Sequence, residues 1–304
     1  MKYLWGIDLG GTKVEGVVLS NDDQHDVIIR ERIPTEAPKG YQHVLGQIKK
    51  LIDQTATQLG SKPEKLGIGT PGTLDPFTGT IKNSNSVVLN GQPFKKDLEA
   101  LLGIPIMIAN DANCFALAEA RMGIVPDIAP DAQVVFGVIM GTGVGGGIVV
   151  NGKAIYGKQG IAGEWGHNFL DESGGPCYCG KVGCTETIIS GPALERYYES
   201  ISGEALKLKE IVRRHLVQSD EYATETMERL TKFFGLGISK IVNVLDPDVI
   251  VLGGGVGNID LLYTEGVKEA AKHVFDTTGA FRTPIVKPKL GDSAGVFGAA
   301  FLVE

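Results

Sequence analysis

The hydrophobic residues of this chain fall into two kinds of stretch, short runs of β-type residues and longer stretches with helical spacing. Residues 3–7, 14–19 and 27–33 predict three strands joined by turns, and residues 41–59, apolar on one side only, predict an amphipathic helix. Further strands are predicted at 66–68, 105–109, 249–252 and 284–290, and further helices at 94–102, 114–122, 192–201, 204–217, 221–244, 259–275 and 295–302. Strands that alternate with helices predict an α/β fold.

A glycine-rich turn joins the first two predicted strands. Asp8 ends the first strand, and the chain continues through Gly10, Gly11, Thr12 and Lys13 into the second. Backbone N–H groups that no side chain covers form an anion-binding nest, and a carboxylate at its mouth suits a divalent cation. The turn therefore predicts a site for phosphate and Mg²⁺, although an ordinary tight hairpin would show the same residues.

The same pattern returns at residues 139–151, where a predicted strand enters a turn with Thr142 and Gly143 and leaves in a second strand. This repetition predicts an internal duplication of one strand-turn-strand unit, and two such turns could hold one polyphosphate. Residues 141–146 also match the dinucleotide-binding fingerprint, but that motif must open a helix and here a strand follows. Residues 147–153 approach the nucleotide P-loop, but Ala154 stands where Ser or Thr is required, so both motifs are rejected.

A third glycine turn follows the apolar run at residues 249–252. Gly254 and Gly255 lie in this turn, and neither has a side chain that would hold a ligand away from the backbone. We therefore expect a flat part of a ligand here, such as a nucleotide base and its ribose.

Asp111 follows the predicted strand at residues 105–109, next to Asn110. Ligands of α/β folds bind at the carboxyl ends of strands, so Asp111 could act as a general base on an alcohol that attacks a phosphoryl group. Alternatively, Asp111 or Asn113 only caps the following helix. The uncharged polar stretch at 83–86 is either a solvated loop or one wall of a pocket for a polar, neutral substrate.

Three of the four cysteines lie close to a histidine in a glycine-rich stretch. His167 is followed by Cys177, Cys179 and Cys184, a spacing typical of zinc held by three thiolates and an imidazole. Four protein ligands leave no position for a reacting water, so a structural zinc is favoured over a catalytic one. Disulfides are the alternative, but in a reduced, cytosolic protein this spacing favours a metal.

Two carboxylates, Glu164 and Glu186, lie just outside this set of ligands. We expect zinc to hold them, together with the free edge of His167, in place for a ligand. The fourth cysteine, Cys114, stands at the start of a predicted helix and is expected to be a small buried apolar residue.

Composition narrows the function further. The chain has 304 residues, of which 43% are hydrophobic, and a net charge of -7. An acidic chain without a basic run argues against a nucleic-acid partner. Asp8 interrupts the first apolar run before a signal-peptide core could form, and glycines interrupt the apolar run at 134–150, which is too short to span a membrane. We therefore expect a cytoplasmic protein of two domains or one large one.

Taken together, these motifs resemble the ROK family of sugar kinases and repressors, which has the actin-like, or ribonuclease H-like, ATPase fold. The stretches that carry the resemblance are residues 8–13 (DLGGTK), 67–72 (GIGTPG), 109–113 (ANDAN), 141–147 (GTGVGGG), 163–167 (GEWGH), 177–186 (CYCGKVGCTE) and 251–258 (VLGGGVGN). The resemblance implies a duplicated α/β fold with two lobes around a central cleft. A smaller lobe would span residues 1–114, completed by about 291–304, and a larger one 115–290 with the zinc loop.

The resemblance also implies roles for individual residues. Asp111 would remove the proton from the 6-hydroxyl of the sugar, and Asp8 would hold Mg²⁺ through water. The sugar-binding residues would be Gly72, Asn110, Asp111, Glu164, His167 and Glu186. The residues that bind ATP and its phosphates would be Asp8, Gly10, Gly11, Thr12, Lys13, Thr142, Gly143, Gly254 and Gly255. The zinc at His167, Cys177, Cys179 and Cys184 would be structural.

Within the family, residues 83–94 (NSNSVVLNGQPF) and 176–184 (PCYCGKVGC) most resemble the bacterial fructokinases, including mannofructokinase. We therefore expect an ATP- and Mg²⁺-dependent fructose 6-kinase that also accepts mannose or glucose, and the family implies a homodimer. N-acetylglucosamine kinases share ANDANCFAL at 109–117, so such a kinase, or a glucokinase, is the alternative within the family. The alternative from another class is a non-catalytic sugar-sensing protein, although Asp8 comes too early to leave room for the DNA-binding segment of the repressors.

Overall fold

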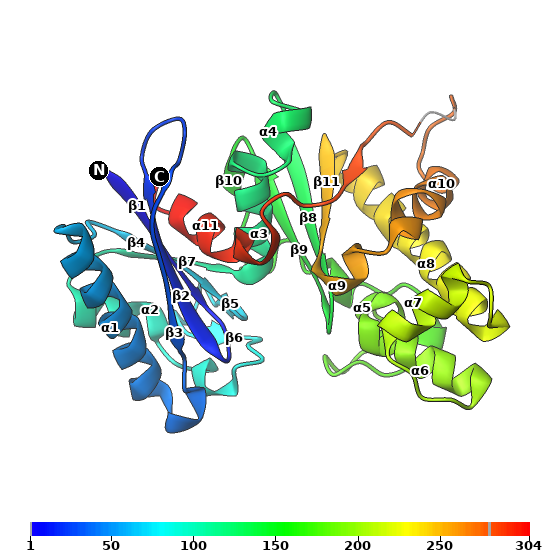
Figure 1. Cartoon of the computed structure of the whole chain (residues 1–304), viewed down its shortest axis with the longest axis horizontal. Coiled ribbons are helices and arrows are strands. Elements are labelled where there is room, and N and C mark those ends of the chain that lie inside the picture. The colour runs from blue at the N-terminus through cyan, green and yellow to red at the C-terminus, as the bar shows by residue number, and fades with distance from the viewer. Residues whose placement is uncertain (1, 279–280) are drawn as a thin grey trace. The chain divides into compact units, whose positions relative to one another are not determined.

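The computed structural model describes residues 2–278 and 281–304 (Figure 1). The chain forms two compact units. Unit 1 contains residues up to Ile128, Gly147–Gly163 and Lys289–Glu304, and unit 2 contains Ala129–Gly146 and Glu164–Pro288. These boundaries differ from those expected for the lobes, because the helix after Asn110 packs on the C-terminal helix and so belongs to unit 1. The division into functional lobes stays a prediction.

Unit 1 is built on a five-stranded sheet with the order β3-β2-β1-β4-β7. Its strands are β1 (Tyr3–Leu9), β2 (Lys13–Ser20), β3 (Val27–Pro34), β4 (Leu66–Thr70) and β7 (Ile106–Asn110). The first three strands are antiparallel, whereas β4 runs parallel to β1 and β7 runs parallel to β4. A two-residue hairpin of β5 (Thr73–Leu74) and β6 (Ile81–Lys82) follows β4.

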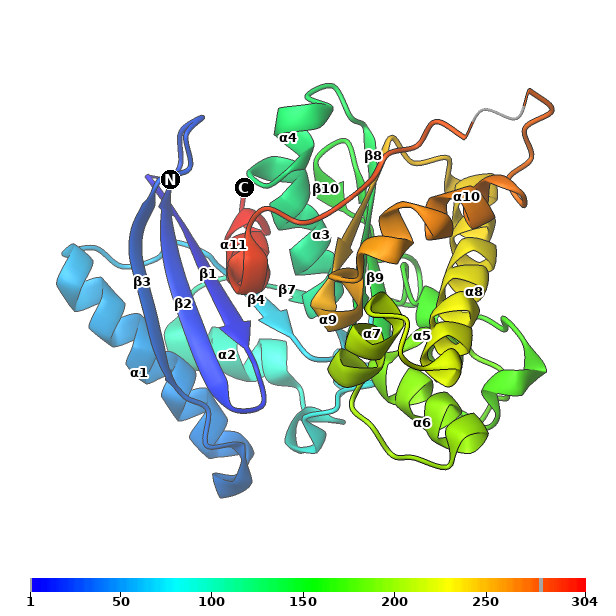
Figure 2. The ribbon, with the colours of Figure 1, turned by 45° about the vertical axis from the view of Figure 1, so that its right-hand side comes forward.

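Helices cover both faces of this sheet (Figure 2). One face carries α1 (Tyr41–Leu59) and α2 (Phe94–Leu102), and the other carries α3 (Asp111–Arg121) and α11 (Ala294–Phe301). The short α4 (Val125–Ile128) follows α3. Helix α1 has the predicted bounds, and the apolar side that its spacing predicted is buried in the core of unit 1. It ends at Gly60, whose φ of 71° favours glycine.

The backbones of β4, α11 and α3 approach one another closely because glycines lie at the contacts. A Cβ at Gly67 would lie 1.8 Å from the carbonyl oxygen of Ala299, and one at Gly298 would lie 1.7 Å from that of Cys114. Small residues in α11 therefore permit this close packing. This packing fixes α3 against the parallel strands at whose ends Asp8 and Asp111 lie.

The second five-stranded sheet has the order β10-β9-β8-β11-β12. Its strands are β8 (Val134–Met140), β9 (Val144–Val150), β10 (Lys153–Ala154), β11 (Val249–Gly253) and β12 (Ile285–Val286). As in the first sheet, β10 is antiparallel to β9, while β11 is parallel to β8 and β12 is parallel to β11. The two sheets share one order of connection, which confirms the internal duplication predicted from the repeated turn.

The helices of unit 2 are α5 (Glu186–Ile189), α6 (Gly191–Ser202), α7 (Leu208–Leu216), α8 (Glu221–Leu245), α9 (Gly254–Gly257) and α10 (Glu265–Ala271). Helices α6, α7 and α10 all pack against the long α8. In the described part of the chain, every helix is too short or too polar to cross a lipid bilayer.

Three predicted elements of unit 2 are shorter than expected. The helix predicted at 204–217 begins at Leu208, because the preceding Lys207 is extended. The helix predicted at 259–275 is divided into a 3-10 turn, Asp260–Tyr263, and α10, and Thr264 between them is not helical. The strand predicted at 284–290 is reduced to β12, whose neighbours Pro284 and Pro288 have no N–H to donate.

Candidate functional site

The carboxyl ends of three parallel strands bring the predicted acidic residues of unit 1 together. Asp8 in β1 lies beside Gly69 in β4, and Gly69 lies beside Ala109 in β7. Asn110 ends β7 and Asp111 begins α3. Both carboxylates predicted to serve the chemistry therefore lie at one edge of the sheet, where α/β folds bind ligands.

Asn110 provides the helix cap that the sequence left open between Asp111 and Asn113. Its Oδ1 accepts a hydrogen bond of 2.8 Å from the backbone N–H of Asn113. The cap uses only the side-chain oxygen of Asn110, so the predicted sugar contact would fall to its amide NH₂ group. Asp111 Oδ1 accepts a hydrogen bond of 2.8 Å from the N–H of Ala112. Asn113, whose side chain is buried, has a side-chain oxygen without a hydrogen-bond partner among the described residues.

The surroundings disfavour negative charge on both carboxyls. Burial, and then the charges of Asp111 and Glu15, raise the pKa of Asp8 to about 6, although Lys13 and Arg32 oppose the rise. Part of the Asp111 side chain is accessible, yet desolvation by the surrounding protein raises the pKa of its carboxyl. Two neighbouring carboxyls with raised pKa values form a site that suits a divalent cation, because its positive charge would stabilise both carboxylates.

A buried acidic residue near Asp8, Glu15, was not found from the sequence. Glu15 is buried in β2, where it forms ion pairs of 2.5 Å with Arg30 and 2.8 Å with Arg32. Its position opposite Asp8 follows from the register of β1 and β2. An acidic residue inside an otherwise apolar strand was the available signal, because such a residue needs a partner when it is buried.

The first glycine turn, residues 10–13, has the exposed backbone that its sequence predicted. The N–H of Gly10 donates to the carbonyl of Lys13 at 2.9 Å, and Gly11, Thr12 and Lys13 are exposed. The hydroxyl of Thr35 donates to the carbonyl of Gly10 at 2.7 Å and so supports the turn from β3's end. The turn can therefore present its backbone N–H groups to an anion.

The polar stretch at residues 83–86 is an ordered loop beside this turn. Oδ1 of Asn90 accepts a hydrogen bond of 2.9 Å from the N–H of Ser84, and Nδ2 of Asn90 donates one of 2.8 Å to the carbonyl of Ser84. The Ser86 hydroxyl would lie 3.6 Å from a Cβ at Gly11. Gly72 has a φ of 88°, and the backbone of Ser84 leaves no space for a Cβ there. In this structure Gly72 is thus required for the packing of the loop.

The second glycine turn lies in unit 2 and contacts Glu186. The N–H of Gly141 donates to the carbonyl of Gly143 at 2.9 Å, and Thr142 is exposed. Oε2 of Glu186 accepts a hydrogen bond of 3.0 Å from the N–H of Val144. A Cβ at Gly143 would lie 2.6 Å from that oxygen. One oxygen of Glu186 is therefore fixed by the turn, so the sugar contact predicted for Glu186 would fall to the other.

The residues of the predicted third glycine turn instead form the short helix α9, directly after β11. Gly254 has a φ of 80°, and a Cβ there would lie 2.2 Å from the carbonyl oxygen of Met140. At Gly255 a Cβ would meet no atom within 4 Å. Gly254 is thus required by its contact with β8, whereas Gly255 presents an uncovered backbone of the kind predicted for the nucleoside.

The four predicted zinc ligands of unit 2 are brought together. One ligand atom each from His167, Cys177, Cys179 and Cys184 lies within 4.8 Å of all the others. Nδ1 of His167 is 3.6 Å from Sγ of Cys177, and the Sγ atoms of Cys179 and Cys184 are also 3.6 Å apart. Ligand atoms around a tetrahedral zinc lie roughly 3.5–3.8 Å from one another, given bonds of about 2.0–2.3 Å. All four cysteines of the chain are free, so the disulfide alternative is wrong and the cluster could hold zinc.

Backbone hydrogen bonds close the zinc loop, residues 164–186. The N–H of Thr185 donates to the carbonyl of Asn168 at 2.9 Å, and that of Cys177 donates to the carbonyl of Lys181 at 2.8 Å. Nε1 of Trp165 donates to the carbonyl of Gly145 at 2.9 Å. Since Trp165 lies between Glu164 and His167, this bond joins the predicted sugar-binding part of the loop to β9.

Tyr178, which the sequence analysis did not select, contacts the second nitrogen of His167. The Tyr178 hydroxyl lies 3.0 Å from Nε2 of His167. The sequence feature that could have selected Tyr178 is its place between two predicted ligands, Cys177 and Cys179.

Cys114 is buried as expected, and burial raises the pKa of its thiol well above the usual range.

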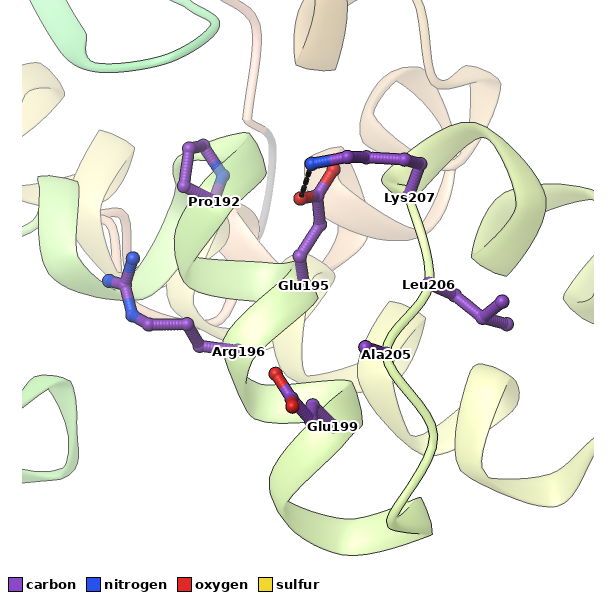
Figure 3. A pocket seen from close by; sticks show the side chains of 7 residues that line it. All are labelled: Pro192, Glu195, Arg196, Glu199, Ala205, Leu206 and Lys207. Carbon is purple, nitrogen blue, oxygen red and sulfur yellow. Dashed lines mark hydrogen bonds and ion pairs between the residues drawn. The ribbon is translucent and has the colours of Figure 1, made fainter.

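Two hollows on unit 2 contain none of the predicted residues. One, of about 270 Å³, lies between α6 and the segment leading to α7 (Figure 3). At its edge, Glu195 forms an ion pair of 2.9 Å with Lys207. The other lies around Asp220, where the carboxylate caps α8 and binds Arg214. The partners of these two carboxylates, Lys207 directly before α7 and Arg214 within it, belong to neighbouring parts of the same unit.

The duplicated sheets and their matching glycine turns define the class of the protein, which is the actin-like ATPase fold. The chain belongs to the ROK family, whose model matches residues 4–304, and at this level it is a sugar kinase.

Relatives of known function match over nearly the whole chain. An N-acetyl-D-glucosamine kinase of Aliivibrio fischeri is 37% identical over 308 residues, which cover 98% of each chain. The crystal structure of a ROK hexokinase from Thermus thermophilus is 31% identical, with a TM-score of 0.86 and coverage of 99% of this chain and 97% of that one. A ROK glucokinase from Streptomyces griseus, solved with glucose and AMPPNP, is 26% identical, with a TM-score of 0.75 and coverage of 99% and 98%.

Proposed function

We propose that this protein is an ATP-dependent kinase that phosphorylates the 6-hydroxyl of N-acetyl-D-glucosamine. The observation that carries the chemistry is the pair of carboxyls, Asp8 and Asp111, at the carboxyl edge of β1 and β7. Support for the sugar comes from the N-acetyl-D-glucosamine kinase that is 37% identical over 98% of the chain.

Asp111 is proposed as the general base. Its raised pKa brings the carboxyl closer to the pH at which it must accept a proton, and its hydrogen bond to Ala112 fixes one oxygen while the other can face the sugar. General-base catalysis contributes typically about 10²–10⁴-fold to a rate. Most of the remaining acceleration would come from positioning the two substrates and from neutralising the charge of the phosphates.

Asp8 and the glycine turns are proposed to bind ATP. Asp8 would hold Mg²⁺ through water, and Mg²⁺, when bound, neutralises charge on the transferred phosphoryl group. Gly10, Gly11, Thr12 and Lys13 would bind phosphates, as would Thr142 and Gly143 in the second turn. Gly254 and Gly255 would lie at the adenosine. The exposed backbone of the first turn and of Gly255 supports these roles.

Glu164, His167 and Glu186 are proposed to bind hydroxyls of the sugar. Zinc, when bound, would supply no reaction step and would act as a structural centre for the loop that carries these three residues. The fit of the four ligand atoms to a tetrahedral ion supports the metal. The fixed oxygen of Glu186 supports a preorganised contact.

Fructose is the second candidate substrate. Residues 83–94, which resemble the fructokinases, run from the ordered loop beside the first glycine turn to the start of α2, and the loop could contact a substrate. The relatives named above do not support the fructose preference expected from these residues, because they are kinases of N-acetyl-D-glucosamine, hexose and glucose. Fructose therefore belongs in every substrate comparison.

The test is the Asp111→Asn variant, which keeps the size of the side chain and removes the base. We expect kcat for sugar phosphorylation to fall by at least about 10²-fold, while titration calorimetry shows sugar binding within about 3-fold of the wild type. Asp53→Asn, which removes an exposed carboxylate on α1, serves as the matched control and should keep full activity. Near-normal turnover of Asp111→Asn would contradict the proposed role.

A further inference from the structure

The contact between Tyr178 and His167 places an exposed aromatic ring at the predicted sugar-binding part of the zinc loop. The Tyr178 hydroxyl is 3.0 Å from Nε2 of His167, and the two rings meet edge to face, with centroids 5.2 Å apart and planes at 88°. The Tyr178 side chain is nevertheless 82% exposed. Its position is thus set by this polar contact and by the loop, with most of the ring left open to a ligand.

Zinc binding by His167 would determine whether His167 or Tyr178 donates the hydrogen bond between them. Nδ1 of His167 faces Sγ of Cys177 inside the four-ligand cluster. With zinc bound at Nδ1, that nitrogen would carry no proton, so Nε2 would carry it and would donate to the Tyr178 oxygen. A phenol oxygen that accepts one hydrogen bond still has its own O–H to donate and a second lone pair. The polar group that this pair presents to solvent is therefore the Tyr178 hydroxyl.

The zinc loop also carries both carboxylates proposed to bind the sugar. Glu164 and Glu186 are the first and last residues of this loop, and Tyr178 lies within it. A phenol hydroxyl beside the imidazole of His167, together with an open aromatic face, matches a sugar, which offers hydroxyls at its edge and C–H groups on its faces.

We propose that Tyr178 is a sugar-binding residue that extends the reach of His167, its hydroxyl bonding a sugar hydroxyl and its ring packing on the sugar. This inference rests on the proposed function, since it concerns the sugar of that same reaction. Within that function, His167 would act on its sugar hydroxyl through the Tyr178 oxygen, which lies 3.0 Å from Nε2.

The test is Tyr178→Phe, which removes the hydroxyl and keeps the ring. We expect KM for N-acetyl-D-glucosamine to rise by about 3- to 10-fold, the size of one net hydrogen bond, with kcat and KM for ATP unchanged. Zinc content, measured by mass spectrometry, should stay at the wild-type value, because no zinc ligand changes. Tyr178→Ala, which also removes the ring, should raise KM further. Tyr222→Phe, at another exposed tyrosine of unit 2, is the matched control and should change nothing.

Two results would overturn the inference. An unchanged sugar KM in Tyr178→Phe would mean that Tyr178 only orients His167, and a lower KM would mean that its hydroxyl competes with the sugar. Direct sugar binding by titration calorimetry separates this inference from the proposed function. If the wild type binds sugar without phosphorylating it, the proposed function fails and the binding constants of the variants still decide the role of Tyr178. If it binds none of the sugars, both fail.

Discussion

Replacing Asp8 by Asn is expected to stabilise the protein at neutral pH, although Asp8 is proposed to serve ATP binding. Burial, and then the charges of Asp111 and Glu15, raise the pKa of Asp8 from 3.8 to about 6. The folded state binds this proton more tightly than the unfolded chain does. The favourable contribution of protonated Asp8 to the free energy of unfolding is therefore complete below pH 3.8. It is lost as the pH rises through about 6.

The magnitude follows from the two pKa values. Relative to low pH, the rise in pKa from 3.8 to about 6 lowers the free energy of unfolding by about 3 kcal/mol at pH 7.5. At pH 4.5, where the folded state still holds the proton, the loss is about 1 kcal/mol. Asn cannot titrate. The gain in unfolding free energy of Asp8→Asn over the wild type should therefore shrink by about 2 kcal/mol between pH 7.5 and pH 4.5.

Urea unfolding without added Mg²⁺ measures this difference. Trp5 and Trp165 are both buried, one in each unit, so a Trp165→Phe background leaves fluorescence that reports on unit 1. Asp131→Asn, which removes the same charge at an exposed position, should show no such pH dependence. Added Mg²⁺ should reduce the difference in unfolding free energy between Asp8→Asn and the wild type at pH 7.5, because it stabilises the wild type. A gain that is equal at both pH values, or a loss at pH 7.5, would refute the reasoning.

Two further predictions concern parts of the structure that support the site. Glu119→Ala should lower the free energy of unfolding by about 3 kcal/mol or more in urea titrations, because the buried carboxylate accepts from the N–H groups of Ile124, Lys289 and Leu290. Glu119→Gln, which keeps one acceptor, should lose less, and equal losses would contradict this explanation. Removal of zinc by a chelator should raise the sugar KM by about 10-fold or more with little change in the KM for ATP, and unchanged sugar binding by metal-free protein would contradict the structural role of the metal.

The elements that the sequence predicted best are those whose pattern depends on burial alone. Helix α1 has the expected bounds because one apolar side and a final glycine define it locally. The repeated Gly-Thr turn predicted the duplication, since each turn lies between strands of the same order in the two sheets. The bounds of β12 and α7 were missed because they depend on prolines and on the extended residue before α7, which periodicity does not report.

The composition of the site was predictable, and its contacts were not. Spacing was enough to collect His167 with its three cysteines, because residues this close in sequence can reach one ion from a single loop. By contrast, the contact of Tyr178 with Nε2 of His167 depends on how that loop folds back on itself. The hydrogen bond that Glu186 accepts from the N–H of Val144 depends on how the loop packs against β9. The ion pairs of Glu15 in β2 likewise required the register of β1 and β2.

The most direct test of the central claim is the kcat/KM of the purified protein with ATP and Mg²⁺ for each of five sugars, N-acetyl-D-glucosamine, N-acetylmannosamine, fructose, mannose and glucose. ADP release is coupled to the assay, and phosphorus NMR locates the new phosphate. We predict transfer to the 6-hydroxyl with the highest kcat/KM for N-acetyl-D-glucosamine. A higher value for fructose would contradict the proposed substrate. ADP release without any sugar phosphate, or no turnover with all five sugars, would contradict the kinase itself.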